Sequence, residues 1–153
     1  MSTVKVTISD RGYAKLMDYL RAQKNLEMTV GLHAEEAEGE AMAAAELNEF
    51  GSPGGMIPAR PAITGWAADN QDGVVRAMRG EMEAAYKARK NPIQRLDQLA
   101  QVCAGDIQGN IAAGIDPPNA ESTVRRKGSS TPLIDTGAFR SSIRGRVRER
   151  GGG

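Results

Sequence analysis

Three short segments of the chain alternate apolar and polar residues, which is the pattern of a half-buried β-strand. They cover residues 3–8, 28–33 and 142–147. In the second segment Met28 and Val30 fall on the same side of the strand, so both side chains are expected to face a core.

Two helices are predicted in the first third of the chain. Ser9 or Asp10 can cap a helix that runs through about Ala22 and carries its apolar residues on one side. Residues 36–50 are rich in alanine and glutamate, which favours a second helix, and Gly51 is placed to end it.

Two longer helices follow, separated at Asn91 and Pro92. The first is expected to start near Asp69 or Asp72, and its apolar residues recur every three or four positions. These residues are Val75, Met78, Met82 and Tyr86. Asn91 can cap the second helix, and Pro92 is tolerated in its first turn. The second helix has the most regular apolar stripe of the chain, and two prolines end it. The stripe and the prolines are Ile93, Leu96, Leu99, Cys103, Ile107, Ile111, Ile115, Pro117 and Pro118.

These elements predict an α+β fold in which a small mixed sheet packs against two long helices, with an extended loop at residues 52–61. Residues 1–116 are expected to form the core domain. Residues 117–153 are expected to form an extended basic C-terminal arm that carries the final strand and belongs to the same domain. Because only 4% of the residues are aromatic, aliphatic residues and methionine must fill the core.

Charge is distributed unevenly along the chain, although the net charge is only +1. From Pro117 onward there are eight basic residues against three acidic ones. Residues 25–59 contain seven glutamates and no lysine or arginine. One interpretation is a solvated acidic helix face and a solvated basic tail. The other is self-assembly, in which an acidic patch on one subunit meets a basic arm of the next.

The composition argues against enzymatic, metal-binding and membrane-spanning functions. A single cysteine and a single histidine cannot easily build a zinc site or a histidine-based catalytic centre. No segment resembles a phosphate-binding loop, because no glycine-rich turn leads into a Lys-Ser or Lys-Thr helix start. No serine or cysteine has a candidate base to activate it as a nucleophile. No apolar run approaches the length of a membrane span. We therefore expect a soluble, non-enzymatic protein with no cofactor and no metal, in which Cys103 is a core residue and His33 is structural or on the surface.

The triplet Asp135-Thr136-Gly137 resembles the active-site triplet of aspartic proteases. Such a protease subunit places the triplet near its start and builds an all-β fold after it. Here only 16 residues follow Gly137, and residues 69–115 are strongly helical. The preferred interpretation is that Asp135 or Thr136 caps a short helical turn that carries Phe139 and Arg140.

Gly105 and Gly109 lie four positions apart in the second long helix. A glycine inside a helix costs about 1 kcal/mol relative to alanine, and close approach of another backbone would offset that cost. The neighbouring backbone is expected to belong to the same subunit, and a second subunit is the alternative.

The last strand carries arginines at alternate positions, Arg144, Arg146 and Arg148, which fall on one side of an extended segment. They could contact phosphate without reading a base sequence. They could also form an arm that docks on an acidic protein surface, which is the interpretation we favour. A small nucleic-acid-binding module that uses this arginine run is the alternative function.

Two groups of segments carry a family resemblance. The first is AELNEFG at residues 45–51, followed by IPARP at 57–61. The second is GIDPPN at 114–119, STVRRKG at 122–128 and PLIDTG at 132–137, closing on RSSI at 140–143. In this order and spacing they resemble the head–tail joining proteins of tailed bacteriophages, the virion-morphogenesis and tail-completion family of siphophages and Mu-like phages. Members commonly carry an aromatic residue after the Arg-Pro pair, where this chain has Ala62.

The resemblance implies a structural virion protein, assembled in the host cytoplasm, that forms a sixfold or twelvefold homo-oligomeric ring in the phage neck. Its expected partners are the adjacent neck and tail proteins, with possible non-specific contact to packaged DNA. Prolines on both sides of Arg60 would fix the presentation of that residue. The candidate interface residues are Phe50, Pro58, Arg60, Pro61, Arg126, Asp135, Thr136 and Arg140. The candidates for contact with the DNA channel or a neighbour are Arg144, Arg146 and Arg148.

Overall fold

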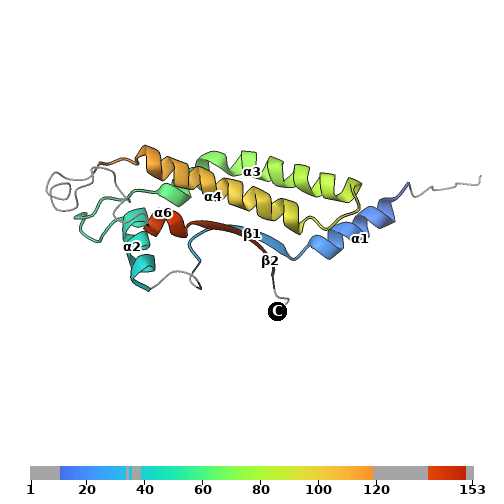
Figure 1. Cartoon of the computed structure of the whole chain (residues 1–153), viewed down its shortest axis with the longest axis horizontal. Coiled ribbons are helices and arrows are strands. Elements are labelled where there is room, and N and C mark those ends of the chain that lie inside the picture. The colour runs from blue at the N-terminus through green and yellow to red at the C-terminus, as the bar shows by residue number, and fades with distance from the viewer. Residues whose placement is uncertain (1–10, 34, 36–38, 119–137, 151–153) are drawn as a thin grey trace, which may run out of the picture.

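A computed structural model describes residues 11–33, 35, 39–118 and 138–150. Its elements are α1 (Tyr13–Gln23), β1 (Leu26–Gly31), α2 (Gly39–Phe50), α3 (Ala62–Lys87), α4 (Ile93–Ala113), α6 (Ala138–Ser142) and β2 (Arg144–Glu149). Figure 1 shows an elongated molecule in which α3 and α4 lie side by side and the strands run along α4. Helices α2 and α6 lie at one end, and α1 lies at the other. The strand predicted at residues 3–8 falls outside the described residues.

The α+β prediction is confirmed, because a two-stranded antiparallel sheet packs against the long helices α3 and α4. Strand β2 pairs with β1, so the C-terminal segment joins the middle of the domain. In the register Met28 lies opposite Val147 and Val30 lies opposite Gly145. Since side chains alternate across a strand, these residues share one face of the sheet, and the three arginines of β2 share the other.

The core lies where α4 meets the sheet and the start of α3. The buried cluster consists of Ala62, Ala104, Ile107, Ile111 and Ile143, with Val30, Leu32, Ile63, Trp66, Ile115 and Phe139 packed around it. The apolar stripe predicted for the second long helix is confirmed at its centre. There Leu96, Cys103, Ile107 and Ile111 are buried. Asn91 accepts a hydrogen bond from the N–H of Ile93 through its side-chain oxygen (2.9 Å), as its predicted capping role requires.

The predicted start of the first long helix is wrong. Helix α3 begins at Ala62 and not near Asp69 or Asp72. No side chain at Pro61, which precedes the helix, caps it. The first N–H groups of α3 are satisfied instead by Glu49, a residue of the preceding helix. A cap that comes from another element leaves no capping side chain in the sequence next to the helix start.

The expectation of a close backbone contact at Gly105 and Gly109 within the subunit is also wrong. A Cβ atom added at either glycine would meet no heavy atom within 4 Å. The close approach is at Gly145 in β2, where a Cβ atom would overlap the carbonyl of Ala100 in α4. The side-chain amide of Gln101 also donates to the carbonyl oxygen of Gly145 (2.7 Å). Strand β2 therefore lies directly on the backbone of α4.

These two environments predict opposite effects for the same substitution. Gly145→Ala is expected to lower the free energy of unfolding by roughly 3 kcal/mol, because neither backbone can withdraw without disturbing the core. Gly105→Ala, on the exposed side of α4, is expected to raise it by about 1 kcal/mol through helix propensity. Chemical denaturation followed by circular dichroism measures both values. Equal effects of the two substitutions would contradict the described packing of β2 on α4.

The buried thiol of Cys103 predicts a pH-dependent effect. Burial, followed by the nearby charge of Asp106, raises the pKa of this thiol. The thiol is therefore expected to react slowly with a disulfide reagent at neutral pH in the folded protein and rapidly in denaturant. As the pH rises past the ordinary thiol pKa, the unfolded state ionises first, so the stability contributed by the protonated thiol decreases. Equal labelling rates in the two states would show that Cys103 is exposed.

Candidate assembly surface

The carboxylate of Glu49 joins the end of α2 to the start of α3. Its oxygens accept hydrogen bonds from the backbone N–H groups of Ala62 (3.0 Å), Ile63 (3.1 Å) and Thr64 (2.7 Å). They also accept one from the hydroxyl of Thr64 (2.7 Å). The first N–H groups of a helix have no partner within it and carry a partial positive charge, so a buried carboxylate is favourable here.

Arg60 forms a second connection at the same end of the molecule. This side chain is only 6% exposed, and its Nε and Nη2 atoms donate to the carbonyl oxygens of Pro117 (2.7 Å) and Pro118 (3.2 Å). Its backbone N–H donates to the carbonyl of Asn48 in α2 (2.7 Å). The guanidinium expected at a subunit interface therefore connects the 52–61 loop to the segment after α4 within one chain.

The loop between α2 and α3 is closed by backbone and side-chain hydrogen bonds. Gly51 ends α2 with a φ of 77°, as predicted, and a Cβ atom there would lie 2.9 Å from the carbonyl oxygen of Ile57. The N–H of Ser52 donates to that same carbonyl (2.9 Å), and the hydroxyl oxygen of Ser52 accepts from the N–H of Ile57 (2.8 Å). The loop conformation is thus fixed at both ends.

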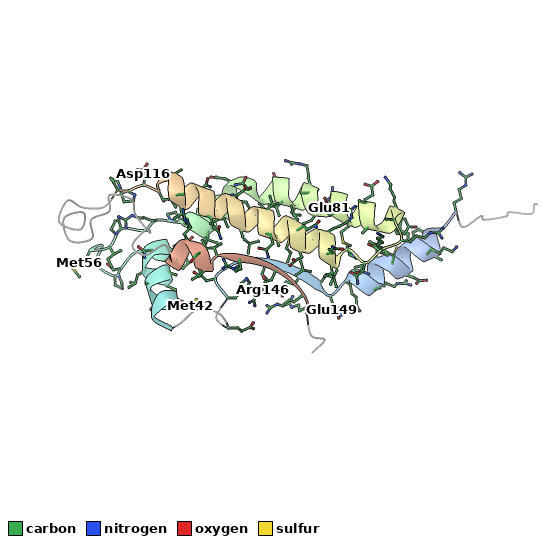
Figure 2. The ribbon with its side chains drawn as sticks, viewed as in Figure 1. Met42, Met56, Glu81, Asp116, Arg146 and Glu149 are labelled. Carbon is green, nitrogen blue, oxygen red and sulfur yellow. The ribbon has the colours of Figure 1, made fainter. Side chains whose placement is uncertain are left out.

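Four large apolar side chains are exposed on this fixed end, and we call them the apolar end patch. They are Leu47, Phe50, Met56 and Ile57. Phe50 is 70% exposed and Met56 is 89% exposed. Figure 2 places Met56 at the α2 end of the molecule, beyond the long helices. Large apolar side chains that are exposed together on one part of a surface commonly mark an interaction site.

A cavity of about 270 Å³ adjoins the apolar end patch and shares Phe50 with it. Its apolar lining comes from β1, α2 and α3 and includes Val30, Met42 and Ile63. Figure 2 shows Met42 on α2, at the same end of the molecule as Met56. An apolar side chain from a partner could enter this space, and the patch together with the cavity forms the candidate assembly surface.

The arginines of β2 lie on the sheet face turned away from α4, where Figure 2 shows Arg146. Two of them meet carboxylates of the same chain. Arg146 lies 3.1 Å from Glu35, and Arg148 lies 3.1 Å from Glu27 across the sheet. Exposed ion pairs of this kind contribute at most about 1 kcal/mol. Arg144 bonds the carbonyl oxygens of Ser141 and Ile143.

The other predicted interface residues fall into two groups. Phe50, Pro58, Pro61 and Arg140 are exposed. Arg126, Asp135 and Thr136 lie outside the described residues, and so does the protease-like triplet. The short helix predicted after the triplet is present as α6.

Sequence reasoning missed Glu49 as a functional position. Proline is common at a helix start, so Pro61 was the available signal that α3 begins at Ala62.

Comparison of the chain with protein-family models, curated proteins and solved structures gave no match. Within the described residues no group of three or more histidine, cysteine, aspartate or glutamate side chains is arranged to hold a metal ion. None of the described helices is long and apolar enough to cross a membrane. His33 lies 3.2 Å from the carbonyl oxygen of Arg144, at the start of β2.

The Glu49 cap predicts a specific loss of stability. Glu49→Gln should lower the free energy of unfolding by about 2 kcal/mol, because an amide keeps one acceptor oxygen and loses the charge at the helix terminus. Glu46→Gln, on the exposed side of the same helix, is the matched control and should change it by less than about 0.5 kcal/mol. Thermal and chemical denaturation measure both. If the two variants were equally stable, Glu49 would not hold α3 in place.

Proposed function

We propose that this chain is a non-enzymatic structural subunit that assembles into a ring in the neck of a tailed phage, joining head and tail around the DNA channel. The ordered series of motifs in residues 45–61 and 114–143 supports the phage assignment by resemblance. The geometry of the apolar end patch supports the assembly role independently of that resemblance.

The observation that carries this proposal is that large apolar side chains are exposed on a rigid support. Met56 lies in a loop closed by Ser52, and Phe50 follows directly after the Glu49 cap. The backbone that carries these side chains is already hydrogen-bonded, so it loses little conformational entropy when a partner covers them. Surface of this kind suits a repeated contact between subunits.

A ring requires a heterologous contact, in which two different surfaces of the subunit meet and the rotation closes. The elongated molecule has distinct surfaces at its two ends and along the sheet (Figure 1). The apolar end patch would form one side of the contact. Arg140 is exposed on α6, and α6 contacts α2. Such a contact would repeat in a ring with the sixfold or twelvefold symmetry expected from the resemblance.

The double variant Phe50→Ser/Met56→Ser is expected to prevent ring formation and leave a folded monomer. Both side chains are exposed in the subunit, so their loss should change the free energy of unfolding by less than about 0.5 kcal/mol. Light scattering coupled to size exclusion measures the oligomer mass, and circular dichroism measures the fold.

Val75→Ser on α3 is the matched control, since Val75 is also exposed but lies outside the apolar end patch. It should leave the oligomer intact. A wild-type chain that stays monomeric at all concentrations, and is missing from purified particles, would contradict the proposed function. A ring that survives the double variant would place the interface elsewhere.

A further inference from the structure

A second concave surface lies at the opposite end of the long helices from the apolar end patch. It is a pocket of about 710 Å³ between α1 and the turn that joins α3 to α4. Its lining residues are Lys15, Tyr19, Gln23, Tyr86, Lys87, Arg89, Lys90 and Asn91. Four of these eight residues are cationic and none is acidic, and we call this site the basic pocket.

Two tyrosines, one from α1 and one from α3, contact each other in the lining of the basic pocket. The rings of Tyr19 and Tyr86 lie 5.2 Å apart at an interplanar angle of 60°, which is a favourable aromatic pair. The Tyr19 hydroxyl lies 3.5 Å from the carbonyl oxygen of Lys90, and burial raises the pKa of this phenol, so it remains a proton donor. These contacts join α1 to the α3–α4 turn and place polar and aromatic groups on one wall of the pocket.

Arg89 occupies a backbone position that glycine normally takes. Its φ is 54°, and α3 ends in a Schellman motif in which Lys90 N–H bonds Ala85 O and Arg89 N–H bonds Tyr86 O, both at 3.0 Å. A left-handed conformation is unfavourable for arginine relative to glycine. The side chain of Arg89 at this position lines the basic pocket.

We propose that the basic pocket binds the phosphate groups of a nucleotide, either as a free nucleoside phosphate or as part of a nucleic-acid strand. Consecutive phosphates of a strand supply one negative charge each, which matches several cations gathered in one concavity. The tyrosine wall offers an aromatic surface for a base. Lys87 pairs with Glu83 (2.6 Å), which lies outside the lining, and within the described part of the chain no carboxylate lines the basic pocket. The inference does not depend on the proposed ring.

A carboxylate-bearing segment of a second copy is the competing occupant. Its charge is sparser than that of a phosphate chain, which carries one negative charge for each phosphate. We therefore favour phosphate. The competing occupant predicts a change of oligomer mass, which a phosphate ligand does not require.

The test uses the full chain and a fluorescein-labelled single-stranded oligonucleotide, with binding followed by anisotropy at several salt concentrations. Lys15→Gln/Lys90→Gln is expected to weaken binding roughly tenfold or more and to reduce the salt slope by about 0.7 for each phosphate contact removed. Arg89→Gly is expected to weaken binding roughly threefold to tenfold while preserving or raising the melting temperature, because glycine suits the left-handed position. That combination separates binding from folding.

Arg76→Gln/Arg79→Gln is the charge-matched control, since both arginines are exposed on α3 outside the basic pocket. It should retain nearly wild-type affinity. Competition by ATP or by inorganic phosphate would identify a free nucleotide or phosphate as the ligand, and competition by unlabelled strands alone would identify nucleic acid.

Three results would overturn the proposal. The first is wild-type binding by both pocket variants. The second is a loss that follows Arg146→Gln/Arg148→Gln instead, which would place the site on the sheet face. The third is absence of binding to any phosphate probe together with an altered oligomer mass in the pocket variants, which would make the basic pocket a subunit contact. The oligomer mass of the same variants is measured separately from oligonucleotide binding. The binding result can therefore be interpreted even if the protein forms no ring.

Discussion

One buried carboxylate sets how the end of α2 meets the start of α3. Glu49 ends α2 and supplies the N-terminal cap of α3, so the angle between these helices is set by hydrogen bonds and not by apolar packing alone. The loop between them is closed by the hydrogen bond of Ser52 with Ile57 and by the positive φ of Gly51. Arg60 then connects the same loop to the segment after α4. Because both charged groups are buried and hydrogen-bonded, removal of either partner would leave unsatisfied polar atoms.

The sequence was most informative where structure is local. The apolar stripe of α4 and the Gly51 stop follow from spacing and from backbone preference, and both are present. The start of α3 could not be predicted in the same way, because its cap is supplied from another helix. The role of Gly145 was hidden for a related reason: only the tertiary approach of Ala100 makes that position require glycine. Local sequence patterns reflect constraints from neighbouring residues. The cap of α3 and the need for glycine at position 145 are instead imposed by residues distant in the sequence.

In the candidate site, too, the sequence indicated which residues matter but not which groups they contact. The exposure of Phe50 agrees with the interface role predicted for it, but exposure alone does not identify a partner. Arg60 was selected from the prolines around it, and those prolines do help to fix it, yet its guanidinium faces the chain's own carbonyls. The arginines of β2 alternate as predicted, and two of them meet glutamates of the same chain. Charge patterns in a sequence show which groups could pair. They do not show whether the partner is internal.

The two surfaces proposed to bind partners lie at opposite ends of α3. This helix has 26 residues, which corresponds to a length of about 39 Å. Sites so far apart share no contacting side chains, so substitutions at the two ends should act independently on stability. A subunit with an apolar contact at one end and a cationic concavity at the other can assemble through the first and keep the second facing a polyanion. The long helices then serve as a rigid spacer, and the sheet packed along α4 stiffens it.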